Sequence, residues 1–179
     1  MKQRYKLLSA LVCLLFFFIS TTQPAFAIDI SAKMKAAYIY NLLQFITFPV
    51  TALQNNSKLN VCIVGENNFG GTLDKIEGES TPQAKIHIVY LPNLSNNDSF
   101  KSCNVLYLTQ SVKNDSKKVL SAIDNKKIVT IADFSPFISD GGLIELFNEK
   151  ENIHFHINTE LLKVSKFQID AEFVMLGSH

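Results

Sequence analysis

Two histidines have the spacing that a metal site on a strand would need. His154 and His156 are two positions apart, so both side chains point to the same face of a predicted strand. The nearest acidic residues, Glu149 and Glu151, fall in the predicted turn before it. Histidines on the solvent face of a hairpin strand are more often solvated polar side chains. We therefore expect no metal and no other cofactor.

Gly65 and the pair Gly70-Gly71 lie between a predicted strand and a predicted helix, where α/β folds bind phosphate groups. Their spacing matches neither the G-x-G-x-x-G pattern of dinucleotide sites nor the G-x-x-x-x-G-K-[ST] pattern of P-loops. Lys75 lies too far along the chain to act as a P-loop lysine. We interpret these glycines as a tight turn from strand to helix.

Nucleophilic and acid–base catalysis have weak support in the sequence. It contains neither a G-x-S-x-G nucleophile elbow nor an H-E-x-x-H zinc motif. Glu77 and Glu79 fall in a predicted loop, and Asp133 and Asp140 flank a turn, where aspartate commonly bonds to nearby backbone. Acid–base chemistry by such residues stays open. We expect no catalytic residues and no enzymatic activity.

Residues 1–27 have the three parts of a cleaved secretory signal peptide. A short basic start precedes an apolar run of fourteen residues (7–20), and residues 25–27 read Ala-Phe-Ala, an A-x-A cleavage site. The run is shorter than the roughly 20 residues of a membrane-spanning helix. We expect cleavage after Ala27, export to the periplasm, and a mature chain (28–179) that does not insert into the membrane.

The composition fits one folded domain. Of 179 residues, 47% are hydrophobic and 18% are charged, which excludes a disordered chain. The mature chain contains 14 lysines, 16 acidic residues and no arginine. A near-neutral surface without arginine is a poor candidate for nucleic-acid binding, which usually needs a basic stripe.

Cys62 and Cys103 are the two cysteines of the mature chain, and an even pair in an oxidising compartment suggests a disulfide. Cys62 lies in the first predicted strand and Cys103 lies just before the third. These strands are neighbours in a doubly wound sheet of order 2-1-3, and neighbouring strands, about 4.8 Å apart, bring Cα atoms within disulfide range. We expect the bridge; two buried free thiols are the alternative.

The apolar pattern alternates between helix and strand periods. Residues 31–48 place apolar side chains three and four positions apart, which predicts a helix capped by Asp29 or Ser31 and stopped by Pro49. Short apolar runs predict strands over residues 59–65, 85–91, 104–109 and 127–132. Short helices are predicted after residues 67–68 and over residues 116–124.

The last part of the chain has a different pattern. A turn-rich loop (133–142) leads into two predicted strands of a hairpin, residues 143–147 and 153–158. Short helices are predicted over residues 159–165 and 170–176, the second with Asp170 as its cap. The expected fold class is α/β: a three-layer, mostly parallel, Rossmann-like sheet with a C-terminal antiparallel hairpin.

Four segments of the mature chain resemble the YfiR family of small periplasmic proteins (YfiR/HmsC-like). They are the opening helix AAYIYNLLQFITFP, the strand LNVCIVG with Cys62, the strand after Cys103, and the run from Ile128 through Gly141-Gly142 to Asn158. Together they cover nearly all of residues 28–179, and their order and spacing are fairly specific. The chain departs from the family pattern where Phe48 replaces a common Trp before the proline, and where a second cysteine pair is missing.

The resemblance implies a non-enzymatic regulator. Such a regulator binds the periplasmic sensor domain of an inner-membrane diguanylate cyclase and represses it, which lowers cyclic-di-GMP signalling and biofilm formation. Beside a complex with the cyclase, we consider a homodimer of this chain as a second form of association. Two other functions stay open: a periplasmic small-ligand-binding module with a cleft at the strand ends, and a hydrolase of unrecognised type.

Phe134, Phe137 and Asp140 are the candidate partner-binding residues. They lie in the loop before Gly141-Gly142, and a few aromatic side chains usually dominate a protein–protein interface. The prediction requires the two rings to be exposed. The alternative is that both phenylalanines pack inward and brace the hairpin.

Overall fold

The structure is a computed structural model that describes residues 30–53, 58–92, 94, 97–150 and 152–177. The predicted signal peptide (1–27) and its cleavage site after Ala27 lie outside these residues. Within the described ranges, no helix is both long enough and apolar enough to cross a membrane.

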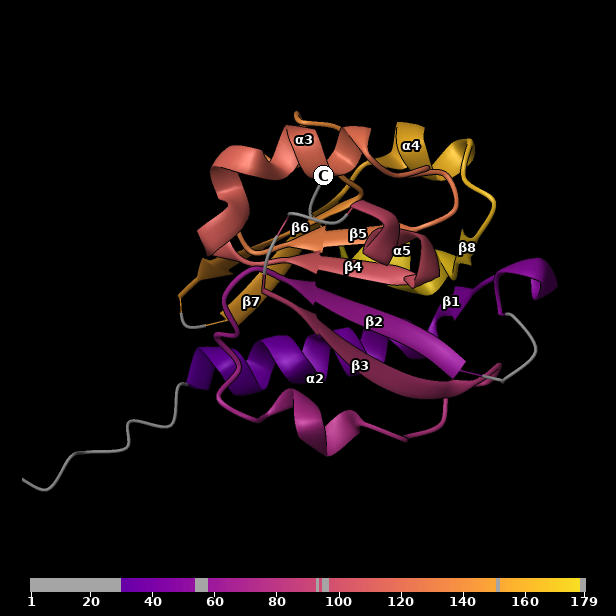
Figure 1. The fold of residues 1–179 in the computed structure, drawn as a ribbon, viewed down its shortest axis with the longest axis horizontal. Helices are drawn as coiled ribbons and strands as arrows, with labels where there is room; N and C mark the ends of the chain where they lie inside the picture. The colour runs from indigo at the N-terminus through magenta and orange to yellow at the C-terminus, as the bar shows by residue number, and fades with distance from the viewer. Residues whose placement is uncertain (1–29, 54–57, 93, 95–96, 151, 178–179) are drawn as a thin grey trace, which may run out of the picture.

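Six strands form one sheet in the order β3-β2-β4-β5-β6-β7 (Figure 1). They are β2 (Lys58–Val64), β3 (Lys85–Leu91), β4 (Val105–Leu108), β5 (Val129–Ala132), β6 (Ile144–Glu149) and β7 (Asn152–Ile157). Within this sheet β6 and β7 pair antiparallel and the other neighbours pair parallel. This confirms the predicted α/β class, the 2-1-3 order of the first three strands and the C-terminal antiparallel hairpin.

Helices and short 3-10 helices connect the strands. The α-helices are α2 (Ile30–Gln44), α3 (Ser116–Ser121), α4 (Thr159–Lys163) and α5 (Ala171–Leu176). The 3-10 helices are η1 (Val50–Ala52), η2 (Leu73–Ile76), η3 (Asn97–Ser102) and η4 (Gln110–Asp115). The predicted helix over residues 116–124 therefore begins as expected and ends three residues early.

The central strands contribute to two buried layers, because successive side chains of a strand point to opposite faces of the sheet. Val61 belongs to the layer that packs against Ile39 of α2. Its neighbour Cys62 belongs to the layer that packs against Val119 of α3. Figure 1 shows α2 on one side of the sheet and α3 on the other, so the domain has three layers.

The first helix is shorter than its apolar pattern predicts. It ends at Gln44, and the next residues form β1 (Ile46–Thr47), which pairs antiparallel with β8 (Gln168–Ile169). The side chain of Gln83 bonds both backbone groups of Phe48: its Oε1 accepts from the N–H at 2.7 Å and its Nε2 donates to the carbonyl at 2.9 Å. These long-range bonds replace those of a further helical turn, so tertiary contacts override the local pattern.

The outer edge of β3 is covered by the segment that precedes it. Ile86 donates its N–H to the carbonyl of Glu79 and accepts from the N–H of Gly78, each at 2.9 Å. The N–H of Ile88 donates to Oε2 of Glu77 at 2.6 Å. Because β2 lies on the other side, β3 has hydrogen-bond partners along both of its edges.

Side-chain caps begin the last two helices. Oδ1 of Asn158 accepts from the N–H of Leu161 at 3.0 Å at the start of α4. Oδ1 of Asp170 accepts from the N–H of Glu172 at 2.8 Å at the start of α5. These caps satisfy N–H groups that the first helical turn leaves without a partner, and the cap at Asp170 is the predicted one.

Candidate functional site

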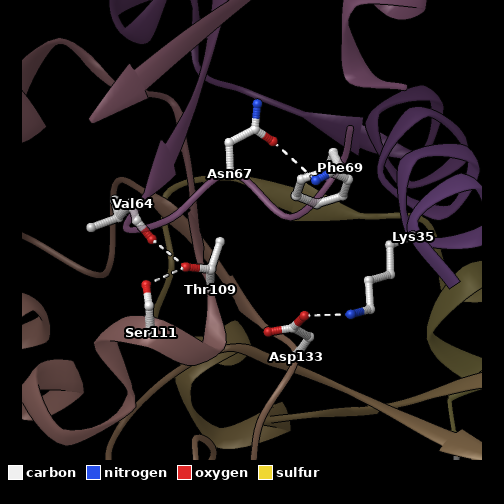
Figure 2. A network of polar contacts seen from close by, with 7 residues as sticks. All are labelled: Lys35, Val64, Asn67, Phe69, Thr109, Ser111 and Asp133. Carbon is white, nitrogen blue, oxygen red and sulfur yellow. Dashed lines mark hydrogen bonds and ion pairs between the residues drawn. The ribbon is translucent and has the colours of Figure 1, made fainter. Parts of the chain in front are cut away.

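The strands β2 and β4 are neighbours, yet the chain leaves them toward opposite edges of the sheet. From β2 it continues to β3 on one side, and from β4 to β5 on the other. In open α/β sheets, ligands bind at the carboxyl ends of the strands where the order reverses in this way. Residues 65–67, residues 109–111 and Asp133 follow β2, β4 and β5 at this position, and Figure 2 shows side chains from all three segments.

Hydroxyl groups fill the turn after β2. Oγ1 of Thr109 donates to the carbonyl of Val64 at 3.1 Å and shares a 2.9 Å hydrogen bond with Oγ of Ser111 (Figure 2). The Ser111 oxygen also accepts from the N–H of Glu66 at 2.9 Å. Gly65 has a φ of +100°, and a Cβ there would overlap both hydroxyl oxygens. The glycine is needed for this close approach, and the two hydroxyls occupy the space beside the turn.

A buried ion pair joins α2 to the end of β5. Nζ of Lys35 lies 2.5 Å from Oδ2 of Asp133, and the two side chains are 19% and 6% exposed (Figure 2). Oδ1 of Asp133 and the hydroxyl of Tyr107 are buried and have no hydrogen-bond partner in the described part of the chain. Burial first, and the negative charge of Asp133 second, raise the pKa of Tyr107 well above its usual value.

This cluster is suited to holding α2 in place. The charges of Lys35 and Asp133 offset each other, and the raised pKa keeps Tyr107 un-ionised at neutral pH. An un-ionised, buried phenol is a poor nucleophile. The arrangement therefore stabilises the fold at the strand ends, where sequence reasoning found only an Asp near a turn.

The predicted histidine pair packs against an aromatic ring. His154 and His156 of β7 both stack on Phe147 of β6, with ring centroids 5.7 Å and 4.6 Å from its centroid. Among the residues that the structure describes, no group of three or more His, Cys, Asp and Glu is arranged to hold a metal ion. The two imidazoles thus have an aromatic packing partner on the hairpin.

The two phenylalanines of the loop before β6 lie in the core. Phe134 and Phe137 are 5% and 0% exposed, and their rings meet edge to face with centroids 5.6 Å apart. A Cβ at Gly142 would overlap the ring of Phe137, so the loop closes tightly over it. Both rings therefore pack inward, which is the alternative stated for them, because burying two phenyl rings removes a large apolar area from water.

Asp140, the third candidate partner-binding residue of this loop, is half-buried and bonded to two side chains. Its Oδ2 accepts from Oγ of Ser116 at 2.7 Å, and its Oδ1 lies 3.3 Å from Nζ of Lys117. Both partners belong to the first turn of α3. The carboxylate therefore ties the loop to the start of that helix.

Cys62 and Cys103 form a disulfide, with Cα atoms 5.9 Å apart. The bond joins β2 to the residue two positions before β4, as the sequence favours, and both cysteines are buried. Beside it, the N–H of Asn104 donates to the carbonyl of Asn60 at 2.9 Å, and the N–H of Asn60 donates to Oδ1 of Asn104 at 2.8 Å. The segment before β4 is thus joined to β2 covalently at Cys62 and by hydrogen bonds at Asn60.

The last helix leaves large apolar side chains in water. Met175 is 78% exposed and Leu176 is 74% exposed. On the same helix, the buried Phe173 meets Phe45, which is itself 38% exposed, with ring centroids 5.4 Å apart. We call Met175 and Leu176 the α5 surface. Sequence reasoning missed it because the apolar pattern of residues 170–176 predicts a helix without indicating which face is covered.

The chain matches a known protein family over nearly its whole length. The family model described as YfiR/HmsC-like covers residues 32–178, from the first turn of α2 past the end of α5. A search among curated proteins finds no match for this chain. The matched range contains the disulfide, the filled strand ends and the α5 surface. The protein therefore belongs to the YfiR/HmsC-like family.

Proposed function

We propose that this protein is a periplasmic, non-enzymatic regulator of cyclic-di-GMP signalling. Residues 1–27 direct its export and are removed, and residues 28–179 form a single domain in the periplasm. There it binds the periplasmic sensor domain of an inner-membrane diguanylate cyclase and represses the enzyme, which limits biofilm formation. The observation that carries this proposal is membership in the YfiR/HmsC-like family over residues 32–178.

The α5 surface supports a role in protein–protein contact. Large apolar side chains that a small domain leaves in water are candidate anchors, because removing apolar area from water drives association. Met175 and Leu176 are adjacent on one helix and about three-quarters exposed. We infer that this surface contacts the partner in place of the buried Phe134 and Phe137, and Asp140 stays a secondary candidate.

Cells that express the cyclase test the regulatory role. Deleting the gene should raise cyclic-di-GMP and biofilm formation, because the cyclase loses its repressor. Restoring the full-length gene should reverse both changes, whereas a version without residues 1–27 should not, because it is not exported. Unchanged cyclic-di-GMP after deletion, with the cyclase gene expressed, would contradict the proposal.

A pair of surface variants tests where the contact lies. Met175→Asp combined with Leu176→Asp should abolish repression at unchanged protein level, because burying two carboxylates in an apolar interface costs a large desolvation free energy. Val50→Asp is the control, since it places a charge on a valine of η1 that is 87% exposed. This control should still repress and still capture the purified sensor domain. Full repression by the double variant would rule out the α5 surface as the contact.

A further inference from the structure

A cavity of ≈520 Å³ opens at the amino ends of the parallel strands, the end of the sheet opposite the network in Figure 2. Residues of η1, the start of β2, the junction of η3 with β4, and the turn from α3 to β5 surround it. In Figure 1 this is the end at which the arrows of β2 and β4 begin. Small-molecule pockets commonly have volumes of about 300–1,000 Å³. The cavity is therefore large enough for a ligand of metabolite size.

Positive charge is in excess around this cavity. Three lysines line it, Lys58, Lys101 and Lys127, against one acidic residue, Asp124. Lys127 lies 3.0 Å from Asp124, and Lys101 lies 2.6 Å from Asp98. These pairs are largely exposed, so water and salt weaken them and an incoming anion can replace the carboxylate.

Other parts of the cavity wall consist of apolar side chains and of side-chain amides that are hydrogen-bonded to the backbone. Ile123 and Ile128 supply apolar surface. Asn60 and Asn104 each donate a side-chain N–H to a backbone carbonyl, at 2.7 Å and 2.9 Å. Because these amides hold the wall together, we assign ligand recognition to the lysines and the isoleucine side chains. The carboxylate of Asp124 also belongs to the wall and lies 3.0 Å from the ammonium group of Lys127.

Covalent and backbone bonds fix the walls before a ligand arrives. The disulfide ties Cys103, which lines the cavity, to Cys62 in β2. In the turn before β5, the N–H groups of Lys127 and Ile128 both donate to the carbonyl of Asp124, at 2.9 Å and 3.2 Å. A site that is already formed loses little conformational entropy on binding, so even a small ligand can occupy it.

We propose that this cavity binds a small carboxylate with an apolar body. The carboxylate lies among the ammonium groups of Lys58, Lys101 and Lys127, and the body packs against Ile123 and Ile128. Lysine acts as a flexible point charge, so binding is expected to be weak and sensitive to salt. The proposal does not depend on the cyclase or on the α5 surface, which lies on other elements.

Fluorine NMR with 4-fluorobenzoate tests the chemistry of the site. Protein that has been exported and purified without reductant should broaden the fluorine signal in a saturable way, with a Kd of about 1 mM. Raising the salt from about 0.05 M to about 0.5 M should weaken binding several-fold. The neutral 4-fluorobenzamide, which has the same ring, should bind at least about fivefold more weakly. Equal binding of the amide, or no saturable binding of the benzoate, would overturn the proposal.

A charge-matched pair of variants tests the location. Lys58→Gln combined with Lys127→Gln should weaken 4-fluorobenzoate binding about tenfold. Lys113→Gln combined with Lys118→Gln removes the same charge from exposed lysines of η4 and α3 that do not line the cavity, and should leave the Kd unchanged. Thermal unfolding should confirm that both proteins are folded. Equal losses in the two variants would overturn the proposal, because the effect would then come from overall charge.

Amide chemical shifts give an independent readout of the same location. Adding 4-fluorobenzoate should shift the N–H signals of Asn104 and Ile128 at the cavity and leave that of Ser111, at the other end of the strands, unchanged. Shifts centred on Ser111 instead would place the ligand at the wrong end and overturn the proposal.

Discussion

At the carboxyl ends of β2, β4 and β5 the protein's own side chains fill the space between the strands, whereas at the amino ends a cavity stays open. Hydroxyl groups around Gly65 and the ion pair of Lys35 with Asp133 hold the filled end. The disulfide of Cys62 with Cys103 and backbone bonds hold the open end. α/β folds commonly bind ligands at the carboxyl ends of their strands, but here side chains at this end hold α2 and the strands together.

The difference between the two ends of the sheet shows how far a fold determines where a ligand can bind. The order of the strands determines where the chain connections diverge, and this divergence creates a position at which a ligand can bind. Side chains decide whether that position stays open. Here they close it at one end of the sheet, while short connections and exposed lysines leave room and positive charge at the other.

Removing the disulfide should have the largest effect, and it acts on the open end. Cys62→Ala combined with Cys103→Ala removes a crosslink between residues 41 positions apart. The chain-entropy account predicts a loss of about 4 kcal/mol in the free energy of unfolding. Denaturant unfolding measures this loss. Intact-mass analysis of unreduced exported protein should also find no free thiol, and two alkylatable thiols would contradict the bridge.

Breaking the buried ion pair should have the next largest effect, at the filled end. Lys35→Met leaves the carboxylate of Asp133 buried without its ammonium partner, and should lower the free energy of unfolding by about 3 kcal/mol. Lys33→Met changes an exposed lysine of the same helix and should cost less than about 0.5 kcal/mol. Equal costs in chemical denaturation would mean that the ion pair does not hold this end.

Gly65→Ala should have an intermediate effect by disrupting the turn after β2. The new Cβ needs an unfavourable φ of +100° and overlaps the hydroxyls of Thr109 and Ser111, so the cost should be about 2 kcal/mol. Gly70→Ala is the control: its φ is +54°, and no atom lies within 4 Å of the new Cβ. It should cost about 1 kcal/mol. Thermal unfolding of both variants compares them, and equal costs would show that the turn is not tightly filled.

Lowering the pH should have the smallest effect on the free energy of unfolding. It acts through the carboxylate of Glu77, at the outer edge of β3. Burial tends to raise the pKa of Glu77, but hydrogen bonds from Ile88 and His87 and the charge of Lys58 lower it below its ordinary 4.5. Because the pKa is lower in the folded state, this stabilisation is present above pH 4.5 and is lost as the pH falls through the folded pKa. The side chain is 45% exposed, so solvent screening keeps the loss to a fraction of 1 kcal/mol.

Glu77→Gln tests this assignment. Stability measured between about pH 5 and pH 3 should depend less steeply on pH in the variant than in the wild type. Glu160→Gln changes the partner of an exposed ion pair with Lys163 on α4 and serves as the control. An unchanged slope in Glu77→Gln would mean that the carboxylate is not stabilised by its neighbours on β3.

Sequence reasoning succeeded where the signal is local or additive. The apolar run over residues 85–91 coincides with β3, and Asp170 caps α5 as its type and position predict. The strand order follows from alternating strands and helices, because crossover connections of one hand permit few arrangements. The disulfide pairing of Cys62 with Cys103 could be expected because compartment, parity and strand order all favour the same pair.

The remaining features depend on contacts that no short segment specifies. Lys35 and Asp133 are 98 residues apart, and nothing around either residue marks it as a partner of the other. β1 and β8 are two residues each, too short for a periodic signal, and form because they meet each other. Phe134 lies in a turn-rich loop whose sequence does not indicate whether its ring faces water or the core.

The covered edge of β3 limits how this protein can associate. An uncovered edge strand offers a row of N–H and C=O groups to which a second chain can add a strand, and such edges promote aggregation. On β3, the backbone of Gly78 and Glu79 and the carboxylate of Glu77 already bond these groups at Ile86 and Ile88. Another chain would first have to break these bonds. We therefore expect that neither a homodimer nor a complex with a cyclase forms by adding a strand at this edge.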